Sequence, residues 1–173
     1  MSEVFVRLVA AVLGAFCLAV TGCALLSPLP DMRTPADRAR EVSPLCKSVG
    51  EDGMATLLSP AFIDTVQPAY ATVPSGAAER EARLRGARIQ LRPMPGMSTE
   101  GLTRAVECHQ SRVALGEVAP VADDPYVLPG SWLDLDATSA RDSYVIVVSA
   151  GDIEDDRQVL ERARRFVARA ATP

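Results

Sequence analysis

The chain has 173 residues, of which 48% are hydrophobic and 23% are charged, and its formal net charge is −4. This composition is in the range of folded globular proteins and excludes a wholly disordered chain. Nucleic-acid binding depends on a basic surface, and this acidic chain carries no zinc-finger, helix-turn-helix or RNA-recognition motif, so we expect no nucleic-acid partner.

A short apolar segment opens the chain. It covers residues 8–20, and Arg7 is the only basic residue before it. At about thirteen residues it is shorter than the roughly 20 that a membrane-spanning helix requires. A basic residue followed by such a run is typical of a secretory signal peptide, which we place at residues 1–22. The alternative is a buried core helix.

The apolar run ends in two small residues, Thr21 and Gly22, followed by Cys23. The stretch from Val20 to Cys23 resembles the lipobox of bacterial lipoproteins. This resemblance implies cleavage before Cys23 and attachment of lipid, including palmitate, to that cysteine. In that family, Ala24 in place of aspartate fits transport onward to the outer membrane. Because two acyl chains give a stable anchor, we expect a lipid-anchored envelope protein that faces the periplasm.

Two cysteines remain in the mature chain, Cys46 and Cys108, because Cys17 is removed with the signal peptide and Cys23 carries lipid. In an oxidising compartment two such thiols predict one disulfide. The alternative is a copper(I) or zinc site formed by Cys46, Cys108 and His109. We favour the disulfide, and with it no metal and no cofactor.

Residues 23–44 are rich in proline and poor in large apolar side chains, which predicts a lipidated cysteine followed by a tether. The prolines of this segment are Pro28, Pro30, Pro35 and Pro44. A single domain is expected over residues 45–173, because about 130 residues form one hydrophobic core. In its first part, residues 54–58 favour a helix and residues 62–66 a short edge strand that ends before Pro68.

Residues 77–85 contain good helix formers and precede Gly86, which predicts a short helix that ends at the glycine. Beyond Gly86, apolar residues alternate with polar ones from Ala87 to Arg92. This period-two pattern predicts a half-buried strand.

The remaining elements have clearer patterns. Residues 99–115 predict a helix, residues 132–137 and 144–149 predict strands, and residues 153–170 predict a helix capped by Asp152. The second of these strands is continuously apolar, so we expect it at the centre of the sheet. The order of elements predicts an α+β fold. It is a two-layer sandwich with helices on one face of a small, mainly antiparallel sheet, in the ferredoxin-like order without its last strand.

The sequence Glu107, Cys108, His109 holds the only histidine of the chain. Neighbouring helical residues project about 100° apart, so Cys108 and His109 do not face each other as a catalytic pair must. We therefore predict no catalytic residues. An enzyme with a site around His109 is the alternative.

The middle of the chain has five arginines at intervals of two to four residues: Arg80, Arg83, Arg85, Arg88 and Arg92. Arg88, Gln90 and Arg92 share the polar side of the predicted strand and form a candidate face for an anionic ligand, such as lipid headgroups or a glycan polymer. A solvated sheet face that is partly neutralised by neighbouring glutamates is the other interpretation, and it is the one we favour from the sequence.

Residues 84–92, the turn at Pro95 and Gly96, and residues 107–112 loosely resemble uncharacterised bacterial envelope lipoproteins with a small α+β domain. That resemblance implies no activity. We therefore expect a membrane-anchored envelope lipoprotein that is a non-enzymatic binding or accessory module for an envelope protein or polymer. The alternatives are a periplasmic copper- or zinc-binding lipoprotein and an enzyme with a site around His109.

Overall fold

The computed structural model describes residues 33–48, 51–74 and 80–170. The predicted signal peptide, the lipobox and Cys23 lie outside these residues. In the part of the chain that is described, no helix is both long and apolar enough to cross a membrane.

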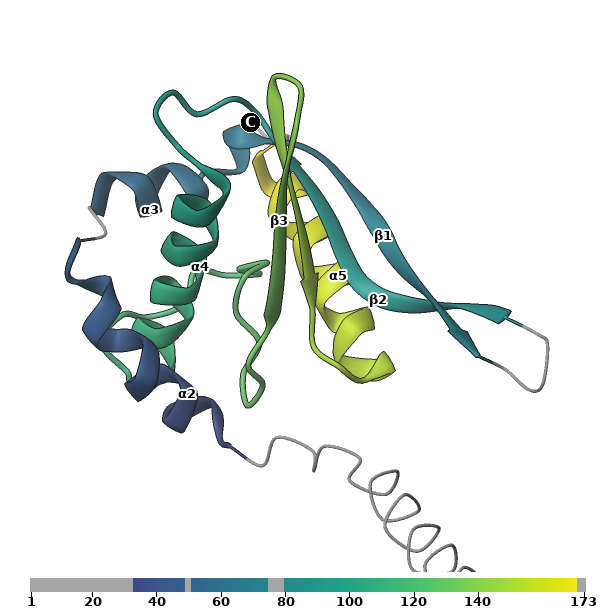
Figure 1. Cartoon of the computed structure of the whole chain (residues 1–173), viewed down its shortest axis with the longest axis horizontal. Helices are drawn as coiled ribbons and strands as arrows, with labels where there is room; N and C mark the ends of the chain where they lie inside the picture. The colour runs from purple at the N-terminus through teal and green to yellow at the C-terminus, as the bar shows by residue number, and fades with distance from the viewer. Residues whose placement is uncertain (1–32, 49–50, 75–79, 171–173) are drawn as a thin grey trace, which may run out of the picture. The chain divides into compact units, whose positions relative to one another are not determined.

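A four-stranded antiparallel sheet in the order β1-β2-β4-β3 forms the centre of the fold (Figure 1). Its strands are β1 (Ile63–Pro74), β2 (Arg80–Leu91), β3 (Asp134–Ala140) and β4 (Ser143–Ser149). Helices α4 (Thr99–Ala114) and α5 (Ile153–Ala170) pack against one face of this sheet. The predicted two-layer α+β fold is confirmed.

Side-chain alternation along the central strands determines which face meets the helices. The inward residues of β2 and β4 share one face and are buried: Ala87, Ile89, Leu91, Ile146 and Val148. Leu102 and Val106 of α4 and Val159 and Phe166 of α5 belong to the same buried cluster. Burial of a large aliphatic or aromatic side chain stabilises a fold by about 1.5–3 kcal/mol, so these contacts join the sheet and both helices in one core.

The connections follow the predicted ferredoxin-like order. β2, α4 and β3 form a crossover unit, and β4 lies between the two strands and is antiparallel to both. The apolar strand β4 is therefore central, as expected. β1 adds an edge strand beside β2 and continues through Pro68 to Pro74. An edge strand tolerates proline because one side of it forms no ladder hydrogen bonds.

The folded unit begins at an earlier residue than the sequence predicts. Instead of a tether to residue 44, α2 (Pro35–Val42) and the 3-10 segment η2 (Ser43–Ser48) belong to a folded unit that begins at Arg33. Thr34 and Asp37 form a capping box at the start of α2. Pro35 occupies the first helical turn, where no backbone donor is lost, so this proline starts a helix instead of preventing one. Helix α3 (Glu51–Leu57) and η3 (Pro60–Phe62) follow.

The helix predicted over residues 77–85 is wrong, because this segment begins β2. Pairing with β1 outweighs the helix propensity of its alanines, glutamates and arginines. Gly86 has a φ of +84° and marks a β-bulge where β2 carries one residue more than β1. Gly86, which predicts the end of a helix, is instead the residue that allows the β-bulge.

The later elements agree with their patterns. The predicted helix at 99–115 is α4 with Ser98 as its cap, and the predicted strand at 132–137 begins two residues later, as β3. Asp152 caps α5, since its carboxylate accepts hydrogen bonds from the amides of Glu154 and Asp155.

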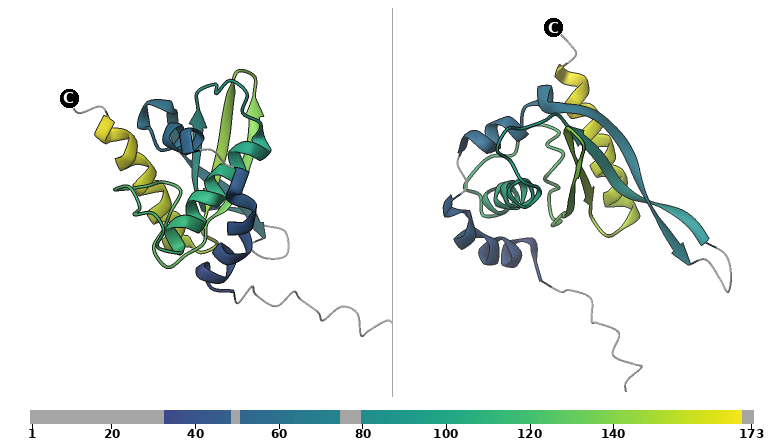
Figure 2. Two further views of the ribbon diagram at one scale, coloured as in Figure 1. Left: turned by 90° about the vertical axis from the view of Figure 1, so that its left-hand side faces the viewer. Right: turned by 45° about the horizontal axis from the view of Figure 1, so that its top comes forward.

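One end of the β1–β2 hairpin projects beyond the sheet (Figures 1 and 2). β4 pairs with β2 only over Ala87–Leu91, so residues 80–84 of β2 pair only with residues 70–74 of β1. We call this two-stranded part, residues 70–74 and 80–84, the arm. Two strands without a covering layer are only marginally stable by themselves, so the sheet behind the arm supports it.

Gly86 is the position where we expect a single methyl group to disturb the sheet most. A Cβ at Gly86 would lie 2.0 Å from the backbone oxygen of Val148. Gly86→Ala is therefore expected to lower the free energy of unfolding by about 3 kcal/mol, measured by urea denaturation. Gly96→Ala is the control, because Gly96 also has a positive φ but its Cβ would meet nothing within 4 Å. Equal losses in the two variants would contradict the close approach of β2 and β4.

Candidate functional site

The face of the sheet that points away from α4 and α5 is called the open face here. Arg88 of β2 pairs with Val147 of β4, and Val147 pairs with Asp136 of β3. Neighbouring strands lie about 4.8 Å apart, so the backbones of Arg88 and Asp136 are about 10 Å apart. An arginine and a carboxylate thus flank an apolar residue in one row across three strands.

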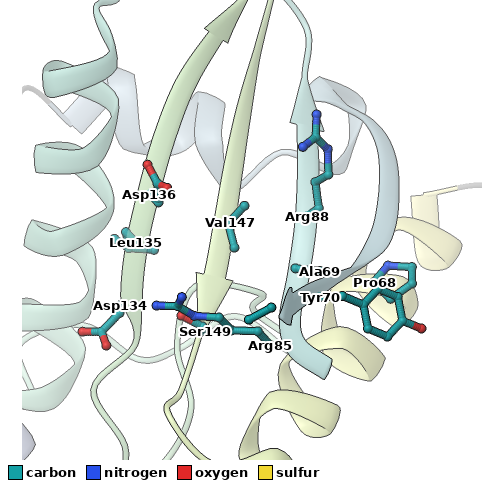
Figure 3. Close-up of a pocket in the computed structure, with 11 residues that line it drawn as sticks. Pro68, Ala69, Tyr70, Arg85, Arg88, Asp134, Leu135, Asp136, Val147 and Ser149 are labelled. Carbon is teal, nitrogen blue, oxygen red and sulfur yellow. The ribbon is translucent and has the colours of Figure 1, made fainter. Parts of the chain in front are cut away.

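This row lies in a hollow of about 420 Å³ on the open face, the sheet hollow (Figure 3). Arg85 and Arg88 line it from β2, and Asp134 and Asp136 line it from β3. In Figure 3 the side chain of Arg85 extends from β2 across β4 in the direction of Asp134. A hollow of 300–1,000 Å³ is the usual size of a small-ligand site.

Of the four charged side chains that line the sheet hollow, only one forms an ion pair among the described residues. Asp134 forms an ion pair of 3.3 Å with Arg38 of α2. Neither Arg88 nor Asp136 has an ion-pair partner among the described residues. These two exposed groups can therefore contact a ligand without giving up an existing ion pair.

The candidate anionic-ligand face predicted from sequence is only partly assembled. Arg88 lines the sheet hollow, whereas Gln90 lies farther along the open face and donates a hydrogen bond of 3.4 Å to Ser143 Oγ. Arg92 follows the end of β2, and its backbone amide donates to the carbonyl of Phe62. The aspartates opposite Arg88 were not part of that predicted face, although their two-residue spacing places them on one side of a strand.

The predicted disulfide is confirmed. Cys46 of η2 and Cys108 of α4 are bonded, and both are buried. The alternative metal set of Cys46, Cys108 and His109 requires free thiolates, which the bonded sulfurs do not provide. Within the residues that the structure describes, no three His, Cys, Asp or Glu side chains are grouped as metal ligands.

His109 forms a buried pair with Asp124 that the sequence does not predict. His109 Nε2 is hydrogen-bonded to Asp124 Oδ2 at 2.6 Å, and these side chains are 4% and 0% exposed. Asp124 Oδ1 accepts the amide of Tyr126, and the Asp124 carbonyl accepts Arg162 Nε. Because His109 is enclosed and engaged, this geometry gives no support to an enzyme site around it.

Gln110 and Ser111 continue the same pattern. The side-chain amide of Gln110 donates a hydrogen bond to the backbone carbonyl of Leu133 and accepts one from the backbone amide of the same residue. Leu133 lies just before β3. Ser111 Oγ donates to the carbonyl of Ala39 in α2. Together with the disulfide of Cys108 and the pair of His109, each residue from Cys108 to Ser111 binds a different segment. We call these four residues the α4 hub.

The loop that supplies Asp124 is also fixed by α5. Arg165 Nε donates a hydrogen bond of 3.0 Å to Asp123, and Arg169 forms a second ion pair with the same carboxylate. The hydrogen bond from Arg165 and the charges of these arginines hold the pKa of Asp123 below its usual value. Burial, and next the carboxylate of Asp124, raise the pKa of Tyr126. The loop is therefore part of the structural framework.

A second hollow, of about 490 Å³, lies between α2, α4 and residues 127–132. No charged side chain lines it, and the amide of Gln110 at its wall is already bonded to Leu133. Two smaller hollows also carry charged side chains, one with Glu100, Arg104 and Glu107 and one with Arg141 and Asp142. The sheet hollow differs from them because it crosses three strands and has arginines on one side and aspartates on the other. Comparisons with protein-family models, curated proteins and solved structures found nothing that matches this chain.

The buried pair of the α4 hub is open to a direct test of its role. Asp124→Ala removes the acceptor of His109 and of the Tyr126 amide, so we expect the free energy of unfolding to fall by about 3 kcal/mol in urea denaturation. Asp136→Ala removes an exposed carboxylate of the sheet hollow and should stay within about 0.5 kcal/mol of the wild type. An Asp124→Ala protein as stable as the wild type would show that the pair does not support the fold.

Proposed function

We propose that the chain is a lipid-anchored lipoprotein of the bacterial envelope, that its α+β domain is a non-enzymatic binding module, and that the open face is its binding surface. The observation that carries this proposal is the one-sided covering of the sheet. Both packing helices lie on the same face, and the opposite face has a hollow with an unpaired arginine and carboxylate on either side of Val147. The partner is an envelope protein or polymer.

Two features support the proposed location. The lipobox resemblance at Cys23 supports a position on a membrane after export. The disulfide between Cys46 and Cys108 agrees with export, because structural disulfides persist in oxidising compartments and are rare in the cytosol. The disulfide between the two mature cysteines and the predicted signal peptide thus both agree with export from the cytosol.

The engagement of His109 supports a non-enzymatic role. The chain has one histidine, and its ring is enclosed with Asp124 and does not line the sheet hollow. The sheet hollow is lined by arginines, aspartates and an exposed tyrosine together with apolar side chains such as Leu135 and Val147. This mixed lining is suited to recognition of a surface or polymer.

The anchor is tested by lipid labelling in a bacterial host. The wild-type chain should incorporate labelled palmitate and fractionate with membranes, because Cys23 carries the acyl chains. Cys23→Ser should lose the label and remain unprocessed, whereas Cys17→Ser should keep both label and processing. Label that persists in Cys23→Ser would exclude the proposed anchor.

The binding surface is tested by site-specific photo-crosslinking in intact cells. A crosslinking side chain at position 147 lies in the middle of the sheet hollow, and one at position 164 lies on the exposed side of α5. We expect an adduct from position 147 only, and we expect Arg88→Ala with Asp136→Ala to abolish it while the unfolding midpoint stays unchanged. The same adducts from both positions, or none from position 147, would contradict the assignment of the open face.

A further inference from the structure

The described arginines of this protein differ in whether they form ion pairs. Seven form ion pairs within the described residues: Arg33, Arg38, Arg40, Arg104, Arg157, Arg165 and Arg169. The five from Arg80 to Arg92 form none there, although Arg83 and Arg85 are close enough to Asp156 for their charge to lower its pKa slightly against the larger effect of burial. Arg112, Arg141, Arg162 and Arg164 also have no ion pair among the described residues, but they are spread over α4, the β3–β4 turn and α5. Four of the unpaired arginines, from Arg80 to Arg88, lie together on β2.

The arm carries the outermost part of this charge. Arg80 and Arg83 are exposed there, and Glu81 is the only acidic residue among its described positions. From residue 70 to residue 92 the sequence has five arginines and two glutamates, in a chain whose net charge is −4. The arm is thus a local basic projection on an acidic protein.

The arm also presents an aromatic residue to solvent. Tyr70 is 64% exposed and lies at the base of the arm, where β1 leaves the sheet. Tyrosine combines an apolar ring with a polar hydroxyl and is enriched at the headgroup level of membranes. Arg80 shares one side of the arm with Tyr70, at the other end of the arm, and Arg83 lies on the opposite side. An exposed tyrosine and two arginines on one projection are a combination suited to a lipid surface.

The position of the arm agrees with such a contact. In Figures 1 and 2 the end of the arm and the start of α2 both lie away from the turn between β3 and β4, although they are on opposite sides of the sheet. About ten residues separate Cys23 from Arg33, which span at most roughly 35 Å when extended. An anchor at Cys23 would therefore keep the start of the folded unit, Arg33, within roughly 35 Å of the membrane.

We propose that the arm binds the anionic phospholipid headgroups of the membrane in which the lipid anchor lies, through Arg80 and Arg83 with Tyr70 at the interface. This inference rests on the anchor in the proposed function. Guanidinium groups form paired hydrogen bonds with phosphate oxygens, and their charge is attracted to an anionic surface. The contact orients the domain on the membrane, so that the open face has a fixed direction.

Vesicle co-sedimentation tests the arm independently of the anchor. The chain from residue 24 onward lacks Cys23 but keeps the core and the disulfide, which lie in the folded unit. It is mixed with vesicles of phosphatidylglycerol and phosphatidylcholine, or of phosphatidylcholine alone, at low ionic strength. We expect binding only to the anionic vesicles, and weaker binding when salt is raised.

Matched variants show whether the arm is responsible. Each arginine near an anionic surface contributes about fivefold to partitioning, so Arg80→Gln with Arg83→Gln should weaken binding about thirtyfold. Arg141→Gln with Arg164→Gln removes the same charge from the β3–β4 turn and from α5, where the arginines are also exposed, and should bind nearly as the wild type.

Three outcomes would overturn the proposal: no binding of the wild type to anionic vesicles, an equal loss in both double variants, or binding to a soluble anionic polysaccharide but not to vesicles. The chain used with the vesicles has no lipid anchor, so a failure to bind vesicles would not change the conclusion from palmitate labelling at Cys23. A failure of palmitate labelling would contradict the proposed anchor, and binding of vesicles by the arm would still be measured independently.

Discussion

A single turn of α4 is the constraint on which the rest of the structure depends. Successive helical residues project about 100° apart, so the four residues of the α4 hub point in all directions around the helix axis. All four are buried, and each binds a different segment: Cys108 binds η2, His109 binds the loop at Asp124, Gln110 binds the residue before β3, and Ser111 binds α2. Such a turn is stable only when it is enclosed on every side, which explains why the proline-containing N-terminal segment folds onto α4 instead of remaining a tether.

In this arrangement the potentially reactive side chains are bonded within the fold, whereas the groups exposed to a ligand lie elsewhere. The thiol, the imidazole and the carboxylate of the α4 hub and its loop are used in bonds within the fold. The exposed charges of β2 and β3 are on the other side of the sheet, where neither packing helix covers them. The structure therefore directs the functional argument to the open face and the arm, and leaves the alternatives at Cys108 and His109, a metal site or an enzyme site, without support.

The sequence predicts elements well where one physical signal dominates. The continuous apolar run of β4, the alternation from Ala87 to Leu91 and the capped helix α5 all have a pattern that burial enforces. The segment before Gly86 is different, because its helix-forming residues become a strand through pairing with β1, a partner that local sequence does not reveal. The pair of His109 and Asp124 has no spacing rule either, since an irregular loop brings the carboxylate to the ring. The aspartates of β3 could have been placed opposite Arg88 only with the strand order known.

In this account the α4 hub supports the fold, and the open face with its arm contacts the envelope. Hydrogen–deuterium exchange of the lipidated chain in nanodiscs that contain phosphatidylglycerol, compared with the unlipidated chain in solution, tests that division most directly. The account predicts added protection in residues 70–74 and 80–91. It predicts no change in the amides of the α4 hub, which we expect to exchange slowly in both states because these residues are buried within a helix. Added protection in α4 or in residues 120–132, with the arm unchanged, would contradict it.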